Sequence, residues 1–386
     1  MSKQSFKIKD IFADNWDSFL KEGYSIRQSV LDNVAKIIHC GDPSLGHALY
    51  YCDKCGNVKY VGFTCKSRFC NSCGSKYIQD RSLSISRKLI RCPHRHLVFT
   101  IPKELRIYFR KNRQLLNVLF EASSNVILSW FHDLNKSESF KPGFVSTLHT
   151  FGRDLKWNPH IHMLLTEGAS GNFTVWRKVS HISFIALRKR WQAALLDILS
   201  KHLPASFYTL KTFLFQNYTD GFYVNAPRKD YSNPLETIKY IIRYTGRPAM
   251  AQSRILDYDG SYVTFYYDRH EDNQRVEETI PVFEFFKRLI IHIHDHPFKT
   301  IRYYGLYAKQ YKHSRQLYPM LSPNQRKFYE RHSDWRSRLL LAFNIDCLAC
   351  SHCGNTMKLL DIFISDGTNP YLANAPPASY NVLSMH

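Results

Sequence analysis

Six of the chain's ten cysteines fall between residues 39 and 73, in a segment with little regular apolar pattern. Such a segment cannot bury enough apolar surface to hold itself together, so we expect another kind of cross-link. Two C-x-x-C pairs, Cys52 with Cys55 and Cys70 with Cys73, are separated by 14 residues, which is close to the spacing of four-thiolate zinc sites. The sequence therefore predicts one structural zinc site from these four thiols, with reduced thiols or a disulfide as the alternatives.

Two smaller cysteine groups stay open at this point. The first could supply most of a second zinc site, although a fourth ligand is not obvious and His39 is the nearest: Cys40, His47 and Cys65. The second either recruits a distant ligand or consists of free thiols: Cys347, Cys350 and Cys353. Basic residues, among them Lys66 and Arg68, lie between the cysteines, so we expect this segment to contact DNA.

The composition favours a nucleic-acid partner. The 386 residues carry a formal net charge of +21, with 24 Tyr, 26 Phe and 6 Trp. Basic side chains meet phosphates and aromatic rings stack on unpaired bases, although a basic enzyme with an aromatic core is the alternative. The sequence shows neither a long uninterrupted apolar run nor an apolar signal-peptide region, so we expect a cytoplasmic protein. Cysteines in that compartment favour metal ligation over disulfides.

The apolar pattern predicts an α+β protein of several parts. We expect a helix over 5–38, and then strands and helices in mixed order from His96 onward. The predicted elements are strands at 96–101 and 221–226, two strands around 145–166, helices at 103–135, 182–202 and 233–246, and a hairpin at 258–267 turning at Asp259-Gly260. The expected divisions are a helical segment over 1–38, a zinc-binding DNA-contacting domain over 39–95, a mixed domain over 96–270, a helical region over 271–345, and a cysteine group with a tail over 346–386.

Two histidines at alternate positions of a predicted strand form the first candidate catalytic feature. His160 and His162 point to the same face, because strand side chains alternate, and such a pair can grip a divalent metal. His149, on the preceding strand, is the favoured third ligand, with Asp154 and Glu167 as rivals. A second H-I-H, at His292 and His294, lies in a helical pattern that sends the two rings to opposite sides, so we interpret it as structural or solvent-facing.

A tyrosine pair on a predicted helix forms the second candidate feature. Tyr240 and Tyr244 lie one helical turn apart, so both hydroxyls emerge on one face, and a tyrosine oxygen can attack a DNA phosphate. The spacing alone is weak in a chain with 24 tyrosines, several of them similarly spaced. Arg243 and Arg247 flank the pair and could hold phosphate.

Three motifs in this order resemble those of the bacterial rolling-circle insertion-sequence transposases, the two-tyrosine members of the HUH endonuclease superfamily. They are H-L-V-F-T-I-P at 96–102, T-F-G-R-D-L-K-W-N-P-H-I-H at 150–162, and Y-I-I-R-Y-T-G-R-P at 240–248. The N-terminal zinc knuckles, I-R-Y-Y-G-L-Y-A at 301–308 and C-S-H-C-G at 350–354 add to the likeness, which covers most of the chain.

The resemblance implies a ferredoxin-like HUH palm, an antiparallel sheet with packed helices, within the domain over 96–270. It implies Mg²⁺ or Mn²⁺ on His160 and His162, and Tyr240 and Tyr244 as nucleophiles that form a 5′-phosphotyrosine and free a 3′-hydroxyl. Arg153, inside the second motif, is then expected to contact DNA. The partners implied are single-stranded element ends and target DNA at the nucleoid of a bacterial cytoplasm, with no membrane.

The sequence thus predicts a DNA transposase with nicking and joining activity, together with structural zinc. One rival is a plasmid relaxase or replication initiator that uses the same chemistry on different DNA. The other is a non-enzymatic zinc-ribbon regulator, which would leave the histidine pair and the tyrosines without a role. The sequence sets neither the recognised DNA sequences nor the oligomeric state.

Overall fold

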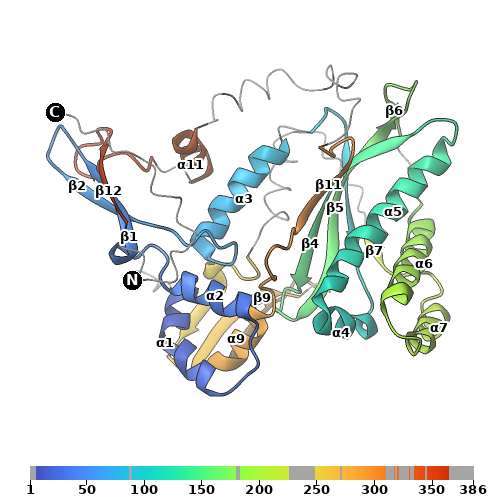
Figure 1. Ribbon diagram of the computed structural model, residues 1–386, viewed down its shortest axis with the longest axis horizontal. Helices are drawn as coiled ribbons and strands as arrows, with labels where there is room; N and C mark the ends of the chain where they lie inside the picture. The colour runs from blue at the N-terminus through green and yellow to red at the C-terminus, as the bar shows by residue number, and fades with distance from the viewer. Residues whose placement is uncertain are drawn as a thin grey trace. The chain divides into compact units, whose positions relative to one another are not determined.

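The computed structural model describes residues 6–86, 89–179, 183–225, 248–269, 272–309, 334–343 and 346–364, together with Leu317, Met320 and Glu330. The chain forms two compact units, each built from separate stretches of sequence (Figure 1). Unit 1 comprises Met1–Asp80, Gly246–His296 and Glu330–His386, and unit 2 comprises Arg81–Thr245 and Pro297–Tyr329. This grouping differs from the five consecutive parts expected from the sequence, because segments far apart in the chain pair as strands of one sheet.

Unit 2 is built on an antiparallel sheet in the order β11-β4-β5-β3-β7, with β6 paired to β5. The long strands β4 (Lys141–Phe151) and β5 (Trp157–Ser170) form its centre, and β3 (His94–Phe99) lies on the other side of β5. The edge and minor strands are β11 (Ile301–Gly305), β7 (Val224–Asn225) and β6 (Arg177–Lys178). β5 therefore has a neighbour on each side, which fixes its side chains firmly.

Helices cover one face of this sheet and close the main core. They are α4 (Lys103–Lys111), the short η2 (Arg113–Leu115), α5 (Leu116–Leu134), α6 (Phe184–His202) and α7 (Phe207–Asn217). Their apolar side chains pack against alternate strand residues such as Phe99 on β3 and Ile161 on β5, both fully buried. Burial of this face is the main stabilising contribution to the unit.

The opposite face of the sheet carries a smaller apolar cluster beside polar residues. Val145 and Leu164 pack there with Leu306 and Tyr307, which follow β11. The strand residues on this face alternate with those of the main core, as the period of two requires. The same face of β4 and β5 carries the histidines. One face of the sheet therefore packs against the helices, and the other carries the candidate functional side chains.

In unit 1 an amphipathic helical layer packs on a small sheet. The helices are α1 (Ile8–Lys21), α2 (Gln28–Ile38) and α9 (Val282–Ile290), and the sheet is β10-β9-β8, from β8 (Ile255–Tyr258), β9 (Tyr262–Asp268) and β10 (Arg275–Pro281), with η3 (Gln252–Arg254) before it. Rings from α1 and α9 form the core, with Phe12 stacked on Phe286 at 4.7 Å between centroids. The predicted hairpin is confirmed, since Asp259 accepts hydrogen bonds from the backbone of Ser261 and Tyr262 in its turn.

A second, smaller sheet of unit 1 joins the two cysteine-rich regions. β1 (Gly46–Tyr51) is its central strand, with β2 (Val58–Gly62) on one side and β12 (Lys358–Ile364) on the other, all antiparallel. In Figure 1 the blue strands β1 and β2 lie beside the red strand β12. The short η1 (Pro43–Leu45) precedes β1, α3 (Asn71–Ser86) follows β2, and α11 (Trp335–Phe343) precedes β12.

Several predicted elements are shorter than the pattern suggested. The predicted helix over 5–38 is two helices, because Gly23, in left-handed backbone at φ +73°, ends α1. The predicted helix over 103–135 is interrupted at Asn112, whose side chain accepts a hydrogen bond from the backbone of Gln114. The region expected to be mostly helical contains the strands β10 and β11, and the predicted helix over 233–246 lies outside the described residues.

The helix prediction at the second H-I-H was wrong, since α9 ends at Ile290 and both histidines follow it. Arg27 on neighbouring α2 donates to the carbonyl oxygen of Ile293 and to the Asp295 carboxylate, so this segment is held against α2. His292 is buried, which fits the structural interpretation. Within the described ranges, no helix is both long and apolar enough to cross a bilayer.

Candidate functional site

Three imidazoles from two paired strands converge on the histidine-bearing face of unit 2. His149 on β4 lies directly across from His160 on β5, and His162 follows two residues later. The ligand nitrogens of the three rings all lie within 4.8 Å of one another. The structure therefore brings together the three residues that the sequence proposed as ligands.

Strand alternation produces this convergence. Ile161, Met163 and Leu165 point into the main core and are fully buried, so the intervening His160 and His162 must point to the opposite face. Burial of three large apolar side chains fixes the orientation of β5 at a stabilisation of roughly 1.5–3 kcal/mol each. A slip of one residue in register would instead turn the imidazoles toward the helices and the main apolar core.

Hydrogen bonding selects the nitrogen that faces the centre. Nδ1 of His160 lies 2.7 Å from the carbonyl oxygen of Asn158, and a carbonyl only accepts, so Nδ1 carries the proton and donates. Nε2 of the neutral His160 ring therefore keeps its lone pair, and it lies 3.0 Å from Nε2 of His162. An ion with bonds of about 2.1 Å at right angles holds two ligand atoms roughly 3 Å apart, so this spacing fits a shared divalent ion.

Burial keeps the rings neutral and ready to ligate. It lowers the pKa of His160 to about 4, with a smaller contribution from the nearby Arg106 charge. Burial, followed by the neighbouring His149, also lowers the pKa of His162 well below its usual value. Neutral imidazoles offer lone pairs to a cation, whereas three imidazolium ions would repel both one another and the metal.

The two carboxylates considered as rival ligands are engaged elsewhere. Glu167 accepts from Nε of Arg95 at 2.6 Å and pairs with the same guanidinium at NH2. Asp154 accepts from the backbone of Lys156 and forms an ion pair with its ammonium at 3.3 Å. Neither belongs to the group of converging ligand atoms, which leaves His149 as the third member.

A fourth histidine, His96 on β3, was missed by the sequence argument. Its Nε2 lies 3.0 Å from Nδ1 of His162, and the two rings stack with centroids 5.2 Å apart. When Nδ1 of His162 donates to His96, Nε2 of His162 is left facing the centre. His96 begins the first motif quoted above, but its proximity to His162 depends on the β3–β5 register, which the sequence alone does not fix.

The other sequence-predicted DNA-processing residues are only partly described. Arg153 is exposed in the turn between β4 and β5, next to the strand ends that carry His149 and His160. The tyrosine pair and its flanking arginines lie outside the described residues: Tyr240, Arg243, Tyr244 and Arg247. The structure thus describes the geometry of the histidine group, and the roles of the histidines and of the tyrosines stay predictions.

The cysteines form two four-thiol clusters in unit 1. The first cluster consists of Cys40, Cys65, Cys70 and Cys73, and the second consists of Cys52, Cys55, Cys350 and Cys353. Sulfur–sulfur distances are 3.6 Å in the first cluster and 3.5 Å in the second, so the thiols are not joined as disulfides. A tetrahedral zinc ion with bonds of about 2.3 Å separates its sulfurs by roughly 3.8 Å, which both clusters approach.

The expected grouping of the two N-terminal C-x-x-C pairs into one site is corrected by this geometry. Cys70 and Cys73 meet Cys40 and Cys65, whereas Cys52 and Cys55 meet Cys350 and Cys353. Sequence spacing alone cannot say which pairs face each other, because the strands β1 and β2 carry Cys52 and Cys55 away from Cys70. Each C-x-x-C pair supplies two of the four thiols of a cluster, and the fold determines which two other cysteines complete it.

His47 and Cys347, two residues of the open groups, belong to neither cluster. Nδ1 of His47 lies 2.8 Å from the carbonyl oxygen of Pro43, and its ring stacks on Phe363 of β12. Lys66 is exposed and Arg68 is half-buried over the ring of Tyr77, both in the segment between Cys65 and Cys70. The expected positive charge therefore lies beside the first cluster.

Two family models match the sequence of the chain. Residues 143–315 match the Y2_Tnp family model, described as "Putative transposase", and residues 11–101 match the model of the transposase zinc-binding domain. The first of these ranges contains the three converging histidines, and the second contains all of the first cysteine cluster. No solved structure matches the chain.

Two curated relatives are similar over most of the sequence. The chain is 31% identical to the transposase for insertion sequence element IS801 of Pseudomonas savastanoi pv. phaseolicola over 322 residues, which cover 78% of this chain and 76% of that protein. It is 25% identical to "Putative transposase y4qJ" of Sinorhizobium fredii (strain NBRC 101917 / NGR234) over 335 residues, or 81% of this chain and 83% of that protein. With its zinc-binding domain, its histidine-bearing sheet and this extent of similarity, the chain belongs to the insertion-sequence transposase family that includes the transposase of IS801.

Proposed function

We propose that this transposase nicks and rejoins single-stranded DNA at insertion-sequence ends through a 5′-phosphotyrosine, in rolling-circle transposition. The observation that carries the proposal is the convergence of His149, His160 and His162 on one face of a rigid sheet. β5 lies between β4 and β3 in that sheet, as the metal-bearing strand of an HUH palm would. We therefore assign the sheet and the helices α4 to α6 to such a palm.

The three imidazoles would hold Mn²⁺ or Mg²⁺, which when bound polarises the scissile phosphate and offsets developing charge. An all-imidazole set favours Mn²⁺ over Mg²⁺, which prefers oxygen ligands and keeps much of its water. His160 is locked by the Asn158 carbonyl and His162 by His96, so two of the three ligands are oriented before any ion arrives. Preorganised ligands lower the entropic cost of binding.

Tyr240 and Tyr244 would supply the nucleophiles. In the nicking step the tyrosine hydroxyl loses its proton as its oxygen bonds to phosphorus, the bond from phosphorus to the 3′-oxygen breaks, and the leaving 3′-oxygen takes up a proton. The joining step is the reverse attack by a 3′-hydroxyl on the phosphotyrosine, so the bond energy is conserved and ATP is not needed. Arg243 and Arg247 would hold phosphate beside the pair.

DNA contact would involve basic residues of both units, acting at the nucleoid of a bacterial cytoplasm. Exposed Arg153 adjoins the histidine centre, and Lys66 and Arg68 adjoin the first cysteine cluster. Zinc in that cluster would be structural, because all four of its ligands are protein thiols and none is left open for substrate. Phosphate contacts release counterions, so binding should weaken steeply as salt rises.

The test incubates the full-length protein with a single-stranded element-end oligonucleotide and Mn²⁺. We expect a covalent protein–DNA adduct that denaturation does not dissolve, with the modified peptide containing Tyr240 or Tyr244 in mass spectrometry. The double variant Y240F/Y244F should form no adduct while keeping its zinc content and its affinity for the oligonucleotide. An adduct of unchanged yield in the double variant would overturn the assignment of the nucleophiles.

A further inference from the structure

Two distant segments of the chain carry the same six-residue pattern. Residues 52–57 read C-D-K-C-G-N and residues 350–355 read C-S-H-C-G-N. The matched zinc-binding domain spans residues 11–101, so it contains the first pattern and not the second. The repeat of cysteine, glycine and asparagine at fixed positions suggests that the two segments have the same local structure.

The backbone confirms that the two segments are matching knuckles. In the first, the N–H of Cys52 donates to the carbonyl of Asn57 at 2.9 Å and the N–H of Gly56 donates to the carbonyl of Cys52 at 2.9 Å. In the second, Cys350 donates to Asn355 at 2.8 Å and Gly354 donates to Cys350 at 2.9 Å. Both glycines have φ +70°, a left-handed conformation that a C-x-x-C turn needs to aim two sulfurs at one point.

The two knuckles face each other with their sulfurs crossed. Sγ of Cys52 lies 3.5 Å from Sγ of Cys353, and Sγ of Cys55 lies 3.5 Å from Sγ of Cys350. The amide Nδ2 of Asn57, which belongs to the first knuckle, lies 3.5 Å from Sγ of Cys350 in the second. All four sulfurs lie within 4.8 Å of one another, as the ligands of one tetrahedral ion would.

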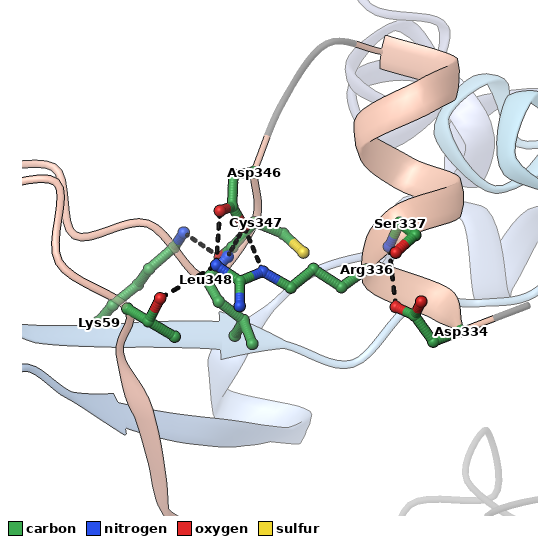
Figure 2. Close-up of polar contacts among 8 residues, drawn as sticks. Lys59, Asp334, Arg336, Ser337, Asp346, Cys347 and Leu348 are labelled. Atoms are coloured by element: carbon green, nitrogen blue, oxygen red, sulfur yellow. Dashed lines mark hydrogen bonds and ion pairs between the residues drawn. The ribbon is translucent and has the colours of Figure 1, made fainter. Parts of the chain in front are cut away.

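Strand pairing and polar contacts seat the second knuckle on the first. β1 pairs with β12 along its whole length, and Lys358 at the start of β12 forms an ion pair with Asp53 inside the first knuckle. Figure 2 shows Lys59 of β2 donating to the carbonyl oxygen of Cys347 at 3.0 Å. It also shows Arg336 of α11 donating to both carboxylate oxygens of Asp346, at 2.8 and 2.6 Å, which ties α11 to the start of the knuckle. The juxtaposition therefore rests on many contacts besides the sulfurs.

We propose that Cys52, Cys55, Cys350 and Cys353 bind a second structural zinc ion, which completes a zinc ribbon from both ends of the chain. Four thiolates arranged as a tetrahedron can bind a zinc ion or an iron–sulfur centre. The two knuckles together supply one set of four sulfurs, which is the number that a single tetrahedral ion needs. The four thiols lose their protons as the ion binds, so binding releases protons to solvent. The zinc-binding domain of this protein is then discontinuous: its first site is local, and its second site needs residues 350–353.

The test counts metal in the full-length protein purified without chelator. Native mass spectrometry and elemental analysis should find two zinc ions per chain in the unaltered protein and one in the variant C350S/C353S. The variant C347S changes a thiol that lies beside the second cluster but outside it, so it should keep two zinc ions. The conservative variant C353H should also keep two, and its zinc X-ray absorption should change by the replacement of one sulfur by nitrogen.

Alkylation with iodoacetamide locates the loss even when folding is perturbed. In C350S/C353S, Cys52 and the exposed Cys55 should be alkylated many times faster than in the unaltered protein, while Cys40, Cys65, Cys70 and Cys73 stay protected by the first zinc. Two zinc ions in C350S/C353S, a single zinc ion in the unaltered protein, or iron in place of zinc at the second cluster would each overturn the proposal.

Discussion

The Nε2 atom of His96 on β3 lies 3.0 Å from the Nδ1 atom of His162 on β5, so an imidazole outside the three-histidine centre orients one of the three rings, which we propose as a metal ligand. Removing such a partner of a metal ligand typically lowers metal affinity 10- to 100-fold. We expect H96F to weaken Mn²⁺ binding by about that factor, as measured by the electron paramagnetic resonance signal of free Mn²⁺, with little change in melting temperature.

The matched control for His96 is His94, two residues earlier on the same strand. It is buried and bonds through Nε2 to the hydroxyl of Tyr307 at 2.7 Å, away from the centre. H94F should lower the melting temperature and leave Mn²⁺ affinity unchanged. H96Q, which restores a hydrogen-bonding side chain, should recover part of the affinity. Equal Mn²⁺ affinity in H96F and the unaltered protein would remove His96 from the site.

Loss of a direct ligand should have a larger effect than loss of its partner. We expect H160A to weaken Mn²⁺ binding by at least ~100-fold, because a three-ligand site that loses one ligand keeps only two protein bonds to the ion. Adduct formation with single-stranded DNA should fall in parallel. H202A, at the exposed end of α6, should change neither quantity, and an unaltered Mn²⁺ affinity in H160A would exclude His160 as a ligand.

Loss of the ion pair between Arg95 and Glu167 should lower the stability of the protein and leave metal binding unaltered. Both side chains are largely buried, with 7% and 15% of their surfaces exposed, and Glu167 neutralises the guanidinium. Removing one partner of a buried pair leaves an uncompensated charge and costs about 3–5 kcal/mol. We expect E167Q to lower the free energy of unfolding by an amount near that range in urea titrations. Mn²⁺ affinity should stay the same, whereas a large drop in affinity would restore Glu167 as a ligand.

We expect the position of Gly305, at the end of β11, to tolerate no side chain. Its φ of +55° is left-handed, and a Cβ there would overlap the carbonyl oxygen of Pro142 on β4. Left-handed backbone alone costs a non-glycine residue roughly 1–2 kcal/mol, and the overlap adds to this. We expect G305A to lower the melting temperature more than G260A, whose Cβ would meet nothing within 4 Å at φ +96°. An equal loss in both variants would show that the β4 contact does not matter.

The histidine centre was predictable because it depends mostly on local rules. Strand alternation places His160 and His162 on one face whatever the rest of the fold does, and His149 lies on the strand that forms the adjoining hairpin. The place of His96 could not be predicted from the sequence, because its position beside His162 follows from pairing between strands more than 60 residues apart. The rule that worked was therefore local, and the failure was one of long-range register.

The cysteine pairing failed for the same physical reason. Spacing favours partners that are near in sequence, whereas Cys55 meets Cys350, 295 residues away. One local signal was present and unused: the shared C-x-x-C-G-N of the two knuckles marks them as halves of one type of site. The break between α1 and α2 was likewise marked by Gly23, but a continuous apolar rhythm on both sides masked it.

The pairing of β1 with β12 affects how the chain can fold while it is being synthesised. β1 leaves the ribosome early, but β12 is translated only some 300 residues later. The edge of β1 that pairs with β12 therefore stays unpaired through most of synthesis. A chain truncated before Lys358 would therefore leave one edge of β1 unpaired, and unpaired strand edges favour aggregation.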